Sequence, residues 1–80
     1  MPTHRFPVIV EQDEDGLFVA ECPTFQGCYS QGATFEEALA NIREVIGICW
    51  HELEAEGRLT EVKLPETIVY TDIAVAVGGA

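Results

Sequence analysis

Alternating apolar and polar residues near the N-terminus predict two strands joined by a tight turn. Residues 5–11 and residues 17–22 are both rich in β-branched and aromatic side chains, which favour strands. The acidic stretch between them ends in Asp15-Gly16, a pair that tolerates positive φ, so we expect a hairpin with a short loop. Pro7 has no backbone N–H to give to a sheet, which indicates an edge strand or a bulge at that point.

A third strand is predicted shortly after the hairpin. Pro23 ends the second strand, and the next four residues have the composition of a loop. Residues 28–31 then form a short strand-like stretch, and Gly32 breaks the pattern. The simplest arrangement of these three segments is an antiparallel meander.

The middle of the chain has the periodicity of an amphipathic helix. Thr34 followed three residues later by Glu37 is the pattern of a capping box, so the helix begins there, and Gly57 marks its expected end. Ile48 and Trp50 widen the apolar stripe beyond what one sheet face needs, which indicates a contact with another subunit. The apolar residues that recur at spacings of three and four are Phe35, Ala38, Leu39, Ile42, Val45, Ile46, Cys49 and Leu53.

The C-terminal stretch, residues 67–77, is strongly strand-prone and predicts a fourth strand. An unprotected edge of this kind invites aggregation, so we expect it to pair with a strand of its own chain or of a neighbour. The order βββαβ corresponds to an α+β fold of two layers, an antiparallel sheet covered by one helix. We expect a homodimer or larger oligomer with this interface: Trp50, Ile68, Tyr70, Ile73, Val75 and Val77.

Length and charge limit the function. Eighty residues suffice for one domain, residues 1–80, and a domain this small gains from oligomerisation. The net charge is −10 with four basic residues, which excludes direct nucleic-acid binding by this chain alone and binding to an anionic membrane. A basic protein partner is favoured instead. The expected contact residues are Asp13, Glu14, Asp15, Phe25, Tyr29, Glu36 and Glu37.

The compartment expected from the sequence is the cytoplasm. The N-terminus lacks a basic segment followed by a long apolar run, and no stretch of eighteen consecutive apolar residues occurs. The cysteines Cys22, Cys28 and Cys49 are odd in number and lie within apolar patterns, which suits reduced thiols.

The stretch from Glu21 to Ala40 resembles the HicB-like antitoxin domain, and the similarity extends over about residues 8–57. The resemblance implies a partial ribonuclease-H-like fold, homo-oligomers, and a non-catalytic role without a cofactor. It also implies a partner, a small basic HicA-like toxin that cleaves messenger RNA and whose active site the antitoxin masks. The residues of the shared motif with structural roles are Pro23, Gly27, Cys28, Gly32, Thr34 and Ala38.

Physical chemistry explains most of this motif as structure. Pro23 and Gly27 shape a loop, and Gly32 is expected to allow an unusual backbone angle. Thr34 caps the helix, and Ala38 lets helix and sheet approach closely. Many members of the resembled family carry a helix-turn-helix or ribbon-helix-helix segment after this domain, and no such helix follows here, so DNA-binding autoregulation is not expected.

Other functions stay open at this point. A solitary oligomeric scaffold or regulator could bind another basic protein, or a small ligand in a loop pocket near Phe25 and Tyr29. A metal-dependent nuclease would need carboxylates converging on metal ions, for which Glu11, Glu21 and Asp72 are the candidates.

Metal binding without catalysis is the less favoured alternative. The turn acids Asp13, Glu14 and Asp15 lack the spacing of a calcium loop, and a solvated turn is the better explanation. Three cysteines and His51 lack zinc-ribbon spacing, so buried small side chains are favoured over a zinc site.

Overall fold

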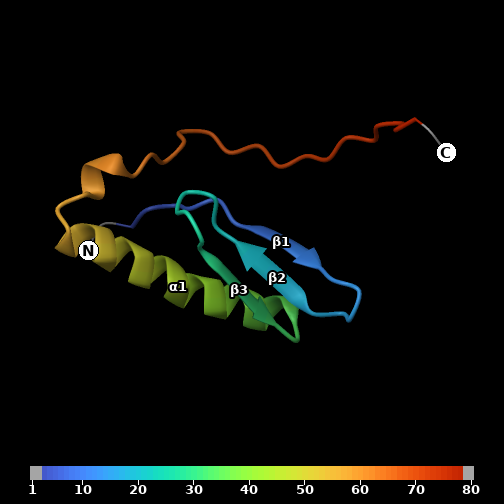
Figure 1. Cartoon of the computed structure of the whole chain (residues 1–80), viewed down its shortest axis with the longest axis horizontal. Coiled ribbons are helices and arrows are strands. Elements are labelled where there is room, and N and C mark those ends of the chain that lie inside the picture. Colours follow the sequence, from blue (N-terminus) through green and yellow to red (C-terminus); the bar gives the residue numbers. More distant parts are fainter. Residues whose placement is uncertain (1–2, 79–80) are drawn as a thin grey trace.

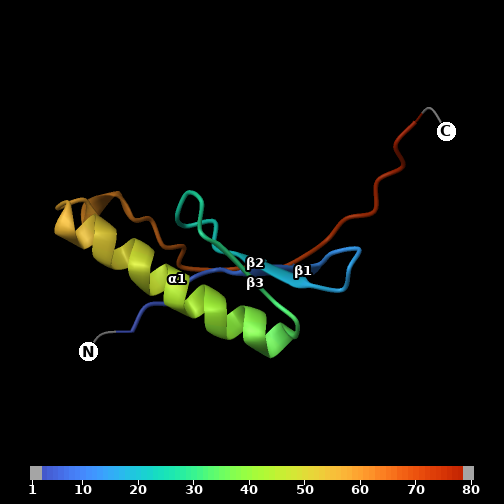
Figure 2. The same ribbon diagram turned by 60° about the horizontal axis from the view of Figure 1, so that its bottom comes forward.

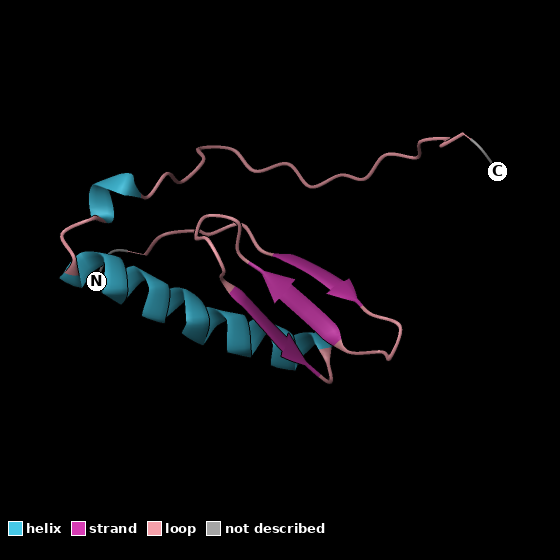
Figure 3. Cartoon of the chain, in the orientation of Figure 1, coloured by secondary structure: helices cyan, strands magenta, loops and turns pink. Residues whose placement is uncertain are grey.

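A three-stranded antiparallel sheet followed by one long helix forms the body of the protein (Figures 1 and 3). The structure is a computed structural model that describes residues 3–78. The strands are β1 (Ile9–Gln12), β2 (Phe18–Glu21) and β3 (Tyr29–Gly32), and they lie in the order β1-β2-β3. The helix α1 spans Phe35–Ala55, and a short 3-10 turn, η1, spans Leu59–Glu61. The predicted α+β class is confirmed for its βββα part.

The turn between β1 and β2 is built around Asp13. Its carboxylate accepts hydrogen bonds from the backbone N–H groups of Asp15 and Leu17, both at 2.9 Å. The backbone of Asp13 also pairs with Gly16 and Leu17, at 3.0 and 2.8 Å. Gly16 has φ +85°, as the Asp-Gly pair predicted. The hairpin is therefore confirmed, and local hydrogen bonds hold its turn.

Two strand limits differ from prediction for identifiable reasons. β1 begins at Ile9 rather than at Arg5, because Pro7 has no N–H to offer to β2. Gly32 does not break β3 but ends it as a paired residue opposite Phe18. The predicted unusual backbone angle at Gly32 is wrong, since Gly32 is not among the described glycines with positive φ. A Cβ there would lie 2.5 Å from the backbone N of Ala38, so the position needs glycine for close approach.

Both ends of α1 follow the predicted capping chemistry. Thr34 Oγ1 accepts the N–H of Glu37 at 3.1 Å, and the Glu37 carboxylate accepts the N–H of Ala33 at 3.1 Å. At the other end Gly57 has φ +70°, and the N–H of Arg58 donates to the carbonyl of Leu53 at 2.8 Å. This is a Schellman ending, and the predicted helix limits are confirmed.

One face of the sheet packs on α1, so sheet and helix form two layers (Figure 2). Asn41 of the helix donates from Nδ2 to the carbonyl of Gln31 at 2.7 Å, which ties α1 to the edge strand β3. The core between the layers is small and contains two of the three free cysteines. Its buried members are Ala20, Cys22, Phe25, Cys28, Ala38 and Ile42.

The predicted fourth strand is wrong for the isolated chain. Residues 63–78 are extended but belong to no strand, and they take part in no backbone–backbone hydrogen bond with any described residue. Figure 1 shows this segment running along the β1 side of the sheet and away from the body. A strand-prone sequence becomes a strand only when another strand satisfies its N–H and C=O groups. The partial ribonuclease-H-like topology depends on that fourth strand and stays a prediction.

Candidate partner-binding surface

The β1–β2 turn and the start of α1 lie at the same end of the sheet. Gln12 pairs with Phe18, and Phe18 pairs with Gly32. These three paired residues place two chain reversals, the β1–β2 turn and the β3–α1 connection, at the same end of the sheet (Figure 1). The rings of Phe18 and Phe35 lie 6.4 Å apart, centroid to centroid, and connect the two segments. We call the five carboxylates on these segments the acidic end: Asp13, Glu14, Asp15, Glu36 and Glu37.

No cation neutralises the acidic end within the described residues. Asp13 and Glu37 accept hydrogen bonds from backbone N–H groups, as described above, and neither forms an ion pair within residues 3–78. Glu14, Asp15 and Glu36 are exposed, and their carboxylates make no hydrogen bond or ion pair in residues 3–78. The ion pairs found there join Arg58 or His51 to acids near the C-terminal end of α1, about 25–30 Å away along the helix axis. The acidic end is therefore an uncompensated negative surface.

The aromatic members of the expected contact set lie elsewhere. Phe25 is only 7% exposed and its ring lies 5.7 Å from that of Phe6, so it belongs to the core rather than to a contact surface. Tyr29 is 56% exposed, but it lies opposite Glu21 at the other end of β3, about 10 Å from Gly32. The negative charge of Glu21 raises the pKa of Tyr29. The structure thus groups the five acids and separates both aromatic residues from them.

The residues expected at an oligomer interface also divide into two groups. Trp50 stacks on His4 at 5.0 Å and meets Phe6 edge to face at 6.0 Å, so its ring packs within its own chain. Ile68 is half-buried. Val69 is also exposed. It was not among the expected interface residues, although it lies in the same strand-prone stretch. Four expected interface residues are strongly exposed: Tyr70, Ile73, Val75 and Val77.

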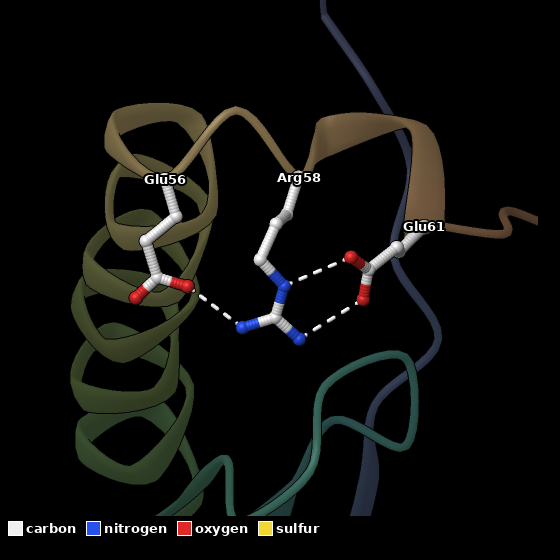
Figure 4. Close-up of polar contacts among 3 residues, drawn as sticks. All are labelled: Glu56, Arg58 and Glu61. Carbon is white, nitrogen blue, oxygen red and sulfur yellow. Dashed lines mark hydrogen bonds and ion pairs between the residues drawn. The ribbon is translucent and has the colours of Figure 1, made fainter.

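A hollow of about 360 Å³ lies beside the loop at residues 24–26, between the end of α1 and η1. Arg58 in its wall is fully engaged: it donates to Glu56 at 2.7 Å and to both oxygens of Glu61 at 2.8 and 2.9 Å (Figure 4). These contacts raise the pKa of Arg58 and lower that of Glu61. Phe25 lines this hollow and Tyr29 does not, so a ligand pocket near both residues stays a prediction.

Candidate metal ligands do not converge in the described residues. No group of three or more His, Cys, Asp or Glu side chains in residues 3–78 is arranged to hold a metal ion. Burial, and then the neighbouring thiols of Cys49 and Cys22, raise the pKa of Cys28 to about 12, which keeps that thiol protonated. His51 is exposed on α1 and lies 3.4 Å from Glu54. The nuclease and zinc alternatives therefore gain no support from this part of the chain.

Comparison with known proteins identifies the family. The model of the family described as "HicB_like antitoxin of bacterial toxin-antitoxin system" matches residues 6–73. The chain belongs to this family. The matched range includes the three strands, α1 and most of the extended C-terminal segment, so that segment is part of the HicB-like domain.

Relatives of similar length support the assignment to the HicB-like family. A UPF0150 protein of Synechocystis is 41% identical over 69 residues, which are 86% of this chain and 100% of the relative. A UPF0150 protein of Helicobacter pylori is 41% identical over 68 residues, 85% of this chain and 93% of the relative. A second Synechocystis UPF0150 protein is 45% identical over 53 residues, 66% of this chain and 67% of the relative.

The HicB-like motif residues act through backbone shape and packing. Gly27 has φ +72°, Thr34 caps α1, and Ala38 is fully buried where α1 approaches Gly32. Exposed Pro23 lies in the loop after β2.

Within the described residues, no helix combines the length and apolarity needed to cross a membrane.

Proposed function

We propose that this chain is an antitoxin that binds a small, basic, HicA-like toxin and masks the toxin's RNA-cleaving site with its acidic end. The role is steric and electrostatic, and the family assignment suggests that it is non-catalytic. Because such a toxin acts on messenger RNA, the pair works in the cytoplasm. The domain, residues 1–80, acts as one unit.

The observation that carries this proposal is the uncompensated charge of the acidic end. An RNA-cleaving protein needs cationic side chains to hold phosphates, and those side chains attract a cluster of carboxylates. Within residues 3–78 the carboxylates of Glu14, Asp15 and Glu36 have no hydrogen bond or ion pair to give up on binding. Opposite fields also accelerate encounter, with rates that fall steeply as salt increases.

Co-purification from the native host tests whether a toxin is present. A tagged chain is isolated, and small basic proteins that come with it are identified by mass. The proposal expects a stoichiometric basic partner with ribonuclease activity that this chain suppresses. Recovery of this chain without such a partner, while the host expresses the neighbouring genes, would contradict it.

Charge reversal tests whether the acidic end makes the contact. The double variant Glu14→Lys/Glu36→Lys is compared with Glu44→Lys/Glu52→Lys, whose positions lie about 12 and 24 Å farther along α1. Both pairs change the net charge equally, from −10 to −6. We expect the first pair to lower the association rate constant at least tenfold and to flatten its salt dependence, with a much smaller effect of the second. Equal effects of the two pairs would show that net charge alone matters and would refute this contact site.

A further inference from the structure

A groove lies between the N-terminal segment, residues 3–8, and the middle of α1. The segment crosses the helix, and two of its rings hold it there (Figure 2). His4 stacks on Trp50 at 5.0 Å, and Phe6 meets Trp50 edge to face at 6.0 Å. The groove has a volume of about 400 Å³, within the range of small-molecule sites in proteins. His4 and Phe6 both line it, so aromatic contacts fix one of its walls.

The walls of the groove are mostly apolar. The part of α1 that lines it, residues 39–47, is about 12 Å long. An apolar wall binds aliphatic groups, because contact removes the apolar area of both ligand and wall from water. An unbranched chain of about eight to ten carbons matches the length of this stretch of helix. The apolar side chains of the walls are Phe6, Val8, Leu39, Ile42 and Ile46.

Gly47 keeps the groove open. A Cβ at this position would meet no atom within 4 Å, and Gly47 is not among the described glycines with positive φ. Neither a close neighbour nor the backbone angle therefore requires glycine here, although glycine weakens a helix interior relative to alanine. Since Gly47 lines the groove, a larger side chain there would occupy part of its volume.

Arg43 supplies a charged group at the same groove. It is exposed, lines the groove and forms no ion pair within residues 3–78. The residues three and four positions away from it along α1 are all uncharged. Arg58, in contrast, is engaged by Glu56 and Glu61. The Arg43 guanidinium is thus available to bind an external carboxylate through two parallel hydrogen bonds.

We propose that this groove binds a medium-chain aliphatic carboxylic acid, with the carboxylate on Arg43 and the chain along the apolar walls. The net charge of −10 favours a ligand with a single negative charge over a polyanion, because each further charge adds repulsion. The carboxylate meets a guanidinium at the exposed rim, so binding buries no charge without a partner. The site adds a small-molecule ligand to a chain whose proposed partner is a protein.

Titration of the full-length chain with sodium decanoate, kept below its micelle concentration, tests the site. We expect one saturable site with a Kd of about 0.1 mM and amide chemical-shift changes concentrated in residues 4–8 and 39–47. Octanoate and hexanoate should bind more weakly, by about fourfold for each methylene removed. Binding that does not saturate by about 2 mM, or shift changes elsewhere, would overturn the proposal.

A neutral ligand tests whether the carboxylate is recognised. 1-Octanol has the same chain length as octanoate but carries no charge. We expect it to bind at least about tenfold more weakly than octanoate, because it cannot form the paired hydrogen bonds with Arg43. Equal affinities of the two ligands would show unspecific apolar adhesion and would contradict the assigned ligand class.

Two substitutions test the shape and the charge of the groove separately. Gly47→Leu fills the groove and introduces a better helix former, so unfolding cannot explain a loss of binding. Arg43→Gln removes the guanidinium and keeps a residue that favours helices. We expect each substitution to raise the Kd of decanoate at least about tenfold.

Matched controls place the same changes outside the groove. Lys63→Gln removes an exposed cation and, like Arg43→Gln, changes the net charge from −10 to −11. Ala55→Leu adds an apolar side chain at the exposed last residue of α1. Both controls should bind decanoate within about twofold of wild type. Control variants that weaken binding as much as the groove variants would make net charge or general surface hydrophobicity the cause, and the assigned site would be wrong.

Sedimentation equilibrium without ligand tests whether a second copy of the chain occupies the groove instead. Gly47→Leu is expected to have the same mass in solution as wild type and Ala55→Leu. A changed mass for Gly47→Leu alone would assign the groove to contact between copies and would overturn the ligand site. None of these experiments contains a toxin, so their results are independent of the antitoxin role.

Discussion

Replacing Gly32 with alanine tests the close contact between β3 and the start of α1. The new Cβ would lie 2.5 Å from the backbone N of Ala38 and 2.9 Å from the backbone C and the Cβ of Glu37. Ordinary contacts begin at 3.4 Å, so the start of the helix must move by about 0.9 Å. Backbone atoms have no alternative rotamer, so the strain is not relieved locally.

The cost follows from two effects. Forcing an extra carbon into a packed contact costs about 1–3 kcal/mol, and the rigid backbone places this site at the upper end. Moving the helix start also weakens the Thr34 cap, which contributes about 1 kcal/mol. A gain of about 0.7 kcal/mol from the stiffer unfolded chain offsets part of this cost. We expect a net loss of about 3 kcal/mol in the free energy of unfolding and a fall of about 15 °C in Tm.

Urea unfolding followed by far-UV circular dichroism measures this loss, at one fixed protein concentration because assembly changes apparent stability. Gly47→Ala is the matched control. Gly47 lies within α1, and a Cβ there meets nothing within 4 Å, so the same substitution should raise stability by about 0.8 kcal/mol through helix propensity. A Gly32→Ala protein within about 0.5 kcal/mol of wild type would refute the close-approach argument.

Two further predictions concern titratable groups. Because burial and the neighbouring thiols raise the pKa of Cys28 from 9.0 to about 12, its thiolate population at pH 8 is roughly 1,000-fold lower than that of an ordinary cysteine. Iodoacetamide followed by peptide mass mapping should leave Cys28 unmodified in folded protein and alkylate it in urea, and rapid alkylation of folded protein would contradict the described burial. Arg58 lowers the pKa of Glu61 below its ordinary 4.5, so this carboxylate stabilises the fold above pH 4.5, and the contribution is lost as the pH falls through the lowered pKa. The Tm of Glu61→Gln should therefore fall below that of wild type at pH 7 and approach it at acidic pH, and a difference independent of pH would exclude this ion pair as its source.

Local chemistry made the hairpin and the helix predictable from sequence. Asp13 and Gly16 close a turn through bonds to residues at most four positions away, and Thr34 with Glu37 starts α1 in the same way. Gly57 ends the helix through a backbone angle that glycine favours. Each of these features depends on residues adjacent in the sequence, so a pattern of a few residues is sufficient to recognise it.

Features that depend on distant partners were harder to predict. Gly32 was assigned to an unusual backbone angle, and close approach was expected at Ala38 alone, because the sequence does not show how the chain turns between β3 and α1. Phe25 is a large aromatic residue of the kind that anchors interfaces. Its ring nevertheless packs against the ring of Phe6, which lies nineteen positions earlier in the sequence. Residues 67–77 have strand propensity, yet they pair with no strand in the isolated chain, because pairing depends on a partner strand distant in the sequence and not on propensity alone.

The sequence predicts the grouping of the five acids only in part. The adjacency of Asp13, Glu14 and Asp15 is visible in the sequence, as is that of Glu36 and Glu37. Their union at one end of the sheet depends on the register in which Phe18 pairs with Gly32. The absence of any cation there, among residues 3–78, also depends on where the fold puts Arg58 and His51.

The acidic end lies on two chain reversals, so its exposed carboxylates are separate from the residues that build the core. The side chains of Glu14, Asp15 and Glu36 belong to no core cluster and make no hydrogen bond in the described residues, so most exchanges there change stability by less than about 0.5 kcal/mol. Asp13 and Glu37 hold the turn and the helix start, and they keep the geometry of this surface constant. On the proposal that the acidic end recognises the partner, related proteins of one genome can therefore diverge in the partners they accept through a few surface changes, while sharing one scaffold.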